Sequence, residues 1–257
     1  MGGEPGPRCA VIDSRAVGRG ELFVGLRGER QDGGGYAAQA LNAGAWGVLV
    51  APEHAELALA AALAGPGGAV LVHPDPLEGL QALARAWRRE LGAGGAKVVA
   101  VTGSTGKTST KDILAAVLGS QMRTVASPEN LNTEIGLPLS VLAAPAGTEA
   151  LVLEMAMRGA GQIAELARIG EPDVGVIVNI GPVHLELLGS LQAIAAAKEL
   201  DWVTASKLLM TPKEQQHFKL LVMQAFRGIK RAPDPTKSRR QQALAKAFCI
   251  AYNASED

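Results

Sequence analysis

One short segment constrains the fold of this chain more than any other: V-T-G-S-T-G-K-T-S-T at residues 101–110. An apolar run typical of a buried strand precedes it at residues 98–101, and a helical pattern follows at residues 107–118. Gly103 and Gly106 allow the backbone to turn closely around an anion, towards which the first amides of a helix point. A strand, loop and helix in this order are typical of a phosphate-binding loop beside a parallel sheet.

The side chains of this loop are those that polyphosphate binding requires. Lys107 supplies a positive charge for the β and γ phosphates of ATP, and the Thr108 hydroxyl can ligate Mg²⁺. Val101 stands where the common form of the motif has its first glycine, so the segment is a variant, and an ordinary turn rich in Gly, Ser and Thr is the alternative. The other residues predicted to contact ATP are Thr102, Gly103, Ser104, Thr105, Gly106 and Ser109.

Apolar runs alternate with helical patterns along the chain, which predicts an α/β fold with mainly parallel strands. We expect strands at residues 22–26, 47–50, 69–72, 98–101, 151–153 and 174–178, and helices at 36–43, 54–63, 77–91, 107–118, 162–169 and 191–198. A glycine-rich stretch at residues 92–96 predicts a hinge or linker. It divides an N-terminal α/β domain, residues 1–91, from a P-loop ATPase-type parallel-sheet domain, residues 97–200.

Residues 201–257 differ in composition from the rest of the chain. They contain 10 of the 25 Lys and Arg residues, 5 of the 25 Asp and Glu residues, and one of the 31 glycines. Two helix-favouring runs, separated by Pro233 and Pro235, predict a short, basic, helical tail that is unrelated to the preceding sheets.

Composition limits the classes of partner. The net charge is zero, which gives no reason to expect a nucleic acid. The most apolar stretch, residues 57–72, contains three glycines and a proline, so we expect no membrane span. No basic-then-apolar leader opens the chain, and Cys9 and Cys249 match no disulfide or metal spacing. These features predict a cytoplasmic protein, which we expect to be a monomer.

Polar residues follow the predicted strands, at the sheet edge where parallel strands place their binding groups. Glu154 ends the run A-L-V-L-E, and a strand beside the loop would direct its carboxylate at a Mg²⁺ held by Thr108. His184 follows the strand at residues 174–178. Alone, Glu154 could be a solvated carboxylate and His184 a structural histidine. Lys198 closes an apolar helical stretch, where a lysine usually extends to solvent.

Taken in order, these segments resemble the Mur ligases of peptidoglycan synthesis over about residues 11–200. The resemblance rests on D-S-R (13–15), G-E-L-F-V-G-L (20–26), T-G-S-T-G-K-T (102–108), N-L-N-T-E-I-G-L-P (130–138), L-E-M (153–155) and N-I-G-P-V-H-L-E (179–186). The loop alone also fits folylpolyglutamate synthases, whereas the asparagine-rich block with L-E-M and N-I-G-x-x-H is similar to the branch of Mur ligases that adds D-Ala-D-Ala. Gly34 departs from the pattern, because the family usually has histidine there.

The resemblance implies an ATP- and Mg²⁺-dependent reaction in cell wall synthesis, and thus a part in cell shape and division. ATP would phosphorylate the carboxylate of a UDP-MurNAc-tripeptide, and the amine of D-Ala-D-Ala would attack the acyl phosphate. Thr108 and Glu154 would ligate one Mg²⁺, and His184 a second, helped by Lys198 as a carbamylated lysine. Asn132 and Glu134, which otherwise suggest a surface loop, would lie near the transferred phosphate. Ser14 and Arg15, otherwise residues of a turn, would hold the uridine diphosphate.

Three functions therefore remain open. The first is this ligase, with its ATP-binding domain only partly present because the resemblance stops near residue 200. The second is a non-catalytic, nucleotide-binding remnant of such a ligase. The third is an unrelated P-loop kinase, for which no base to activate an acceptor hydroxyl stands out near the loop.

Overall fold

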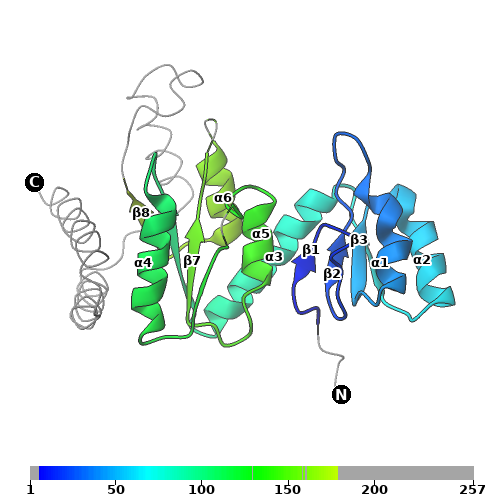
Figure 1. The fold of residues 1–257 in the computed structure, drawn as a ribbon, viewed down its shortest axis with the longest axis horizontal. Coiled ribbons are helices and arrows are strands. Elements are labelled where there is room, and N and C mark those ends of the chain that lie inside the picture. The colour runs from blue at the N-terminus through cyan, green and yellow to red at the C-terminus, as the bar shows by residue number, and fades with distance from the viewer. Residues whose placement is uncertain (1–5, 129, 158, 160, 179–257) are drawn as a thin grey trace, which may run out of the picture.

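The computed structural model describes residues 6–128, 130–157, 159 and 161–178. Within them, eight strands form two four-stranded sheets, and every pair of neighbouring strands is parallel (Figure 1). The first sheet has the order β1 (Ala10–Val11), β2 (Leu22–Val24), β3 (Gly47–Val50) and β4 (Ala69–Val72). The second has the order β6 (Thr124–Ala126), β7 (Ala150–Glu154), β5 (Lys97–Thr102) and β8 (Val174–Ile177). The predicted parallel α/β fold is confirmed.

Helices cover both faces of the second sheet. On one face, α4 (Lys107–Gly119) packs its Leu114 and Leu118 against Val99, Val101 and Val152. On the other face lie α5 (Gly136–Leu142) and α6 (Gln162–Gly170), packed against Val98, Leu151 and Leu153. Odd and even residues of β5 therefore face opposite helical layers, as the pleat of a strand requires.

The first sheet is covered on one face by its own connecting helices. Phe23 and Val48 pack against residues of α1 (Ala37–Asn42) and α2 (Ala55–Ala64). Each of these helices follows a short 3₁₀ turn, η1 (Gly33–Tyr36) and η2 (Pro52–His54). The other face packs against Leu80 of α3 (Pro76–Ala93), together with Leu139 and Leu142 of α5.

Helix α3 belongs to the cores of both sheets. While Leu80 packs against the first sheet, Ala84 and Leu91 pack in the core of the second, and the Trp87 Nε1 donates to the Ala144 carbonyl at 2.8 Å. Figure 1 shows α3 and α5 between the two sheets. The sheets thus share one helical layer.

The glycine-rich stretch predicted as a hinge or linker is instead the end of α3 and a tight turn. Gly92 lies within the helix, and the amides of Gly94, Gly95 and Ala96 donate to carbonyls of α3. Ala96 is 3% exposed, so the turn is packed against the core rather than extended into solvent. The glycines serve a sharp reversal from helix to strand, in which Gly95 has a φ of 96°.

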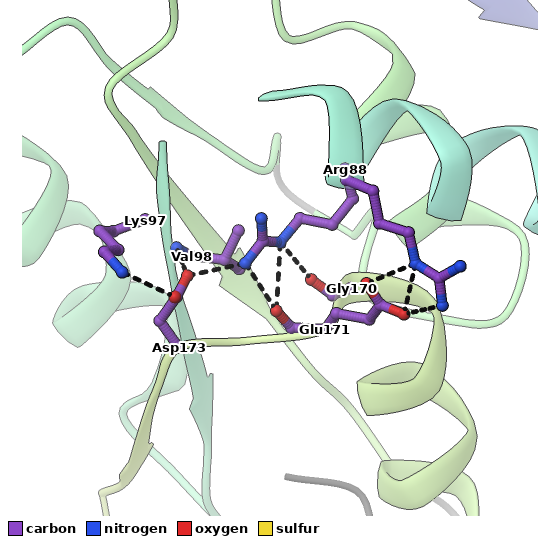
Figure 2. A network of polar contacts seen from close by, with 7 residues as sticks. Arg88, Lys97, Val98, Gly170, Glu171 and Asp173 are labelled. Atoms are coloured by element: carbon purple, nitrogen blue, oxygen red, sulfur yellow. Dashed lines mark hydrogen bonds and ion pairs between the residues drawn. The ribbon is translucent and has the colours of Figure 1, made fainter. Parts of the chain in front are cut away.

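A buried arginine fixes the far end of α3 to the second sheet (Figure 2). The Arg88 guanidinium donates to the carbonyls of Gly170 and Glu171, and at 2.7 Å to the Asp173 carboxylate. Asp173 also accepts from the Val98 amide and from Lys97, at the start of β5. The network therefore joins α3, the end of α6, and strands β5 and β8.

Two short strands and one helix were not predicted: β1, β6 and α5. Predicted strand 22–26 ends at Val24, and residues 33–36 form a 3₁₀ turn before α1. The predicted helix at residues 191–198 and the tail at 201–257 lie outside the described residues. In the described part of the chain, no helix is long and apolar enough to cross a membrane.

Candidate nucleotide-binding site

The loop between β5 and α4 has the backbone of an anion-binding turn. Gly106 has a φ of 79°, a left-handed conformation that favours glycine, and it is the N-cap of α4. Because the N-cap residue is glycine, it has no side chain that could cap the first-turn amides. The Lys107 Nζ folds back and donates to the Gly103 carbonyl at 2.9 Å. The lysine ammonium therefore lies at the loop, where a phosphate would need it.

Glu154 ends β7 directly beside the loop, because β7 pairs with β5 in a register that sets Val101 opposite Glu154. The residue is 5% exposed, and its carboxylate accepts from two side chains. The Thr108 Oγ1 donates to Oε2 at 2.8 Å, and the Asn132 Nδ2 donates to Oε1 at 2.9 Å. The structure thus brings together three residues that the sequence predicted to act on Mg-ATP.

A second layer of contacts holds the end of β7 in place, and the sequence did not predict it. The Glu154 amide donates to the Ser127 Oγ at 3.0 Å, and the Ala156 amide donates to the Asn132 carbonyl at 3.0 Å. Ser127, just after β6, is 1% exposed and accepts at its carbonyl from the Lys111 Nζ at 2.8 Å.

The other predicted nucleotide residues differ in position. Thr102 is fully buried, and among the described residues its hydroxyl has no hydrogen-bond partner. Strand alternation places this hydroxyl on the face of α5 and α6, away from Glu154. Ser109 is exposed in the first turn of α4. Glu134 is also exposed, and its backbone carbonyl accepts from the Gln81 side chain at 3.2 Å. His184 and Lys198 lie outside the described residues.

The predicted uridine-side residues follow the edge strand β1. The Arg15 guanidinium makes a two-point contact with Asp13, at 2.9 Å from Nε and 2.8 Å from Nη2. Hydrogen bonds from the Arg15 side chain and amide hold the pKa of the Asp13 carboxyl at about 2. Ser14 is half-buried between them.

Gly34 lies directly against the side chain of His54. A Cβ on Gly34 would overlap the imidazole of His54, which lies 3.0 Å from the Asp32 carboxylate. Glu53 and Asp32 both pair with Arg27, and hydrogen bonding to His54 lowers the pKa of Asp32. Asp32, Glu53 and His54 have atoms that could ligate a metal within 4.8 Å of one another, but the ion pairs of both carboxylates with Arg27 indicate a structural cluster.

Two family models, each for a different domain, match the chain in consecutive stretches. Residues 9–88 match the model described as "Mur ligase family, catalytic domain", and residues 101–201 match the "Mur ligase middle domain". The chain belongs to the Mur ligase family. The first matched stretch contains the first sheet and most of the shared helix α3, and the second contains β6, β7 and β8 together with the end of β5.

Several curated relatives of this Mur ligase chain share one name. The UDP-N-acetylmuramoyl-tripeptide–D-alanyl-D-alanine ligase of Mycobacterium leprae is 46% identical over 198 residues, which is 73% of this chain and 38% of the relative. The enzyme of the same name from Bacillus subtilis is 44% identical over 191 residues, which is 73% of this chain and 39% of the relative. The chain thus spans less than two fifths of the length of these relatives.

A solved structure shares the fold of the Mur ligase chain. The MurF ligase of Thermotoga maritima in complex with ADP is 33% identical, with a TM-score of 0.62. The match covers 82% of this chain and 47% of that one. A nucleotide is therefore bound in a protein with this arrangement of sheets.

Proposed function

We propose that this chain acts in the ATP-dependent addition of D-Ala-D-Ala to UDP-MurNAc-tripeptide. ATP would phosphorylate the tripeptide carboxylate, releasing ADP, and the dipeptide amine would then displace phosphate from the acyl phosphate to form an amide. The observation that carries the proposal is the buried Glu154 carboxylate, directed at Thr108 beside the loop. The names of the relatives support the choice of substrates.

The residues around Glu154 fit a magnesium ion. Its carboxylate is buried, yet its two side-chain partners in the described part of the chain, Thr108 and Asn132, are both neutral. A buried carboxylate needs a compensating cation, and oxygen ligands are those that Mg²⁺ prefers. Glu154 and Thr108 would hold the ion, which would neutralise charge on the ATP phosphates. Asn132 would keep the carboxylate oriented.

The loop would hold the nucleotide itself. The first-turn amides of α4 and the Lys107 ammonium would bind the β and γ phosphates, with Ser104, Thr105 and Ser109 around them. Glu134 would lie near the transferred phosphate. His184, with a carbamylated Lys198, would support a second metal ion, and a structure that places them away from Glu154 would refute this part.

The N-terminal unit, residues 1–91, would bind the uridine diphosphate through Ser14 and Arg15, while residues 97–200 would bind ATP. Arg15 has five N–H donors, of which two are bound to Asp13, so three could reach a diphosphate without breaking the pair. Titration with UDP should shift the backbone amide signals around Ser14. We also propose a monomer, located in the cytoplasm, because two isolated cysteines fit a reducing compartment.

Calorimetry with Mg-ATP tests the nucleotide site. Replacing Lys107 by alanine should weaken binding at least about tenfold, because a charged hydrogen bond to phosphate contributes about 1.5–3 kcal/mol. Lys97→Ala is the matched control. Lys97 begins β5, the strand that leads into the loop, and it pairs with Asp173 at the opposite edge of the sheet from the loop. Equal affinities for wild type and Lys107→Ala would refute the site.

An ADP-release assay separates the ligase from a nucleotide-binding remnant. The assay contains UDP-MurNAc-tripeptide and Mg-ATP, with or without D-Ala-D-Ala. Dipeptide-dependent turnover at an ordinary enzyme rate, about 1 per second or faster, would support ligation by this chain. Binding of Mg-ATP with no dipeptide-dependent release would favour the remnant.

A further inference from the structure

Lys111 is a buried lysine that the proposed chemistry does not use. It lies on α4 one turn after Lys107 and is 3% exposed. Its Nζ donates to the Ser127 carbonyl at 2.8 Å and lies 2.9 Å from the carboxylate of Asp112, which is exposed. Lysines usually extend their ammonium groups into solvent, and burying one is unfavourable unless it is well bound. This ammonium is directed instead at the backbone just after β6.

Ser127 is bound on three sides. Its amide donates to the Val152 carbonyl at 2.9 Å, its hydroxyl accepts from the Glu154 amide, and its carbonyl accepts from Lys111. Two of these bonds reach β7, and the third reaches α4. Ser127 is therefore the point at which the strand that carries Glu154 and the helix that carries Thr108 are joined.

The segment that starts at Ser127 also supplies the other support of the carboxylate. The chain continues to Asn132, whose side chain donates to Glu154 and whose carbonyl accepts from the Ala156 amide. Lys111 and Thr108 are three residues apart, so they lie on the same face of α4, towards the sheet. A displacement of Ser127 would therefore move both supports of Glu154 relative to the Thr108 hydroxyl.

We propose that Lys111 is a positioning residue for the metal site: its bond to the Ser127 carbonyl holds Glu154 opposite Thr108. The inference rests on the proposed function, in which these two residues hold Mg²⁺. Lys111 contributes through Ser127 and touches neither the ion nor the nucleotide. Its loss should weaken only the gain in ATP affinity that Mg²⁺ provides, and leave the affinity without Mg²⁺ unchanged.

The test is calorimetric titration of the full chain with ATP, once with Mg²⁺ and once with EDTA. Glu154→Gln sets the scale, because it removes the charged ligand and should abolish most of the gain. Lys111→Met should reduce the gain by about tenfold, the effect of a hydrogen bond to a charged group. Lys111→Arg, which can still donate to the Ser127 carbonyl, should restore most of it. Asp112→Ala removes the exposed partner alone and should match wild type.

Ser127→Ala removes the hydroxyl that accepts from the Glu154 amide, at the other end of the connection from Lys111, and should also lower the gain. If Lys111→Met does not fold, Ser127→Ala and Lys111→Arg together test the proposal. A wild-type gain in Lys111→Met, or in Ser127→Ala, would overturn the proposal. An equal loss of ATP affinity with and without Mg²⁺ would also overturn it, because that pattern indicates a general structural role. If wild type itself bound no Mg-ATP, the proposed function would fail, and the role of Lys111 with it.

Discussion

Single side chains in this protein show how the same functional group is used in opposite ways. Asp13 follows the parallel strand β1 and Glu154 ends the parallel strand β7, yet Asp13 is neutralised by Arg15, whereas Thr108 and Asn132, which donate to Glu154, are neutral. The first is a closed ion pair at the surface, and the second is a buried charge directed at a phosphate-binding loop. A cation is therefore expected at Glu154 and not at Asp13.

The Asp13 pair predicts a titration that can be followed by nuclear magnetic resonance. Arg15 holds the pKa of the Asp13 carboxyl at about 2, so this carboxyl should remain ionised in wild type as the pH falls from 6 to 3. In Arg15→Gln the pKa should rise towards the ordinary value of an aspartate. Because the pKa of Asp13 is lowered in the folded protein, the pair contributes its stability above the ordinary pKa of an aspartate. This contribution is lost as the pH falls through about 2.

Arg19→Gln is the control for this titration, because Arg19 is exposed and forms no ion pair with Asp13. The carboxyl carbon shift of Asp13 should be the same in Arg19→Gln as in wild type. If the midpoint did not rise in Arg15→Gln, the two-point contact would be absent in solution.

At the scale of elements, the loop and α4 form one unit in which the backbone is as important as the side chains. Gly106 both starts the helix and turns the chain, and a Cβ there would lie 3.3 Å from the Val178 side chain. The conformation and the contact together explain why this position needs glycine.

Gly106→Ala should therefore destabilise the fold and weaken ATP binding. A left-handed conformation costs a residue with a Cβ about 1–2 kcal/mol, and the loop amides would shift to relieve it. Gly35→Ala is the control, because Gly35 has an ordinary φ and open space around it. It should leave stability unchanged or raise it by about 0.4–1 kcal/mol. Urea unfolding measures the stability of both variants. If Gly106→Ala were as stable as Gly35→Ala, the left-handed conformation would not be what requires glycine at position 106.

The elements with clear sequence patterns were predictable, and the short ones were not. Runs of buried Val and Leu indicated β3, β5 and β7, which the structure confirms. By contrast, β1 has two residues and β6 has three, too few to establish a period. Helix α5 reads G-L-P-L-S-V-L, and its glycine, proline and continuous apolar character conceal a helical pattern.

In the candidate site, the sequence predicted the residues whose functional groups suit ATP or Mg²⁺, and it did not predict the residues that hold them in place. Thr108 and Glu154 could be paired because adjacent parallel strands end at the same edge of a sheet. Ser127 and Lys111 gave no such signal individually. A weak signal was present for Lys111, since it shares the helical face of Leu114 and Leu118, where a lysine interrupts an apolar stripe. Its partner could not have been inferred, because β6 was not predicted.

At the scale of the whole molecule, the shared layer of α3 and α5 makes the two sheets depend on each other. The first sheet buries Leu22 and Val24 against this layer, and the second buries Leu151 and Leu153 against it. Neither sheet can lose the layer without exposing its own core. We therefore expect the two sheets to unfold together, although each carries a different proposed binding site.

The Arg88 network provides the test of this coupling. Arg88→Met would remove the guanidinium donor from the carbonyls of Gly170 and Glu171 and from the Asp173 carboxylate, which would keep Lys97 and the Val98 amide (Figure 2). Removing one partner of a buried pair costs about 3–5 kcal/mol, and because Asp173 is partly exposed we expect about 2–4 kcal/mol in urea unfolding. Arg89→Met is the control, since its side chain is 66% exposed and its pair with Glu171 should contribute less than about 1 kcal/mol.

The same unfolding experiment distinguishes coupled from independent sheets. Trp46 reports on the first sheet and Trp87 on the shared layer, so single-tryptophan variants allow each region to be followed by fluorescence. If the layer couples the sheets, Arg88→Met should shift the transitions at both tryptophans to the same lower urea concentration, although the hydrogen bonds of Arg88 within the described residues go to the second sheet and its connections. A shift at Trp87 with no change at Trp46 would show that the first sheet is stable on its own, and that α3 is a connection rather than a common core.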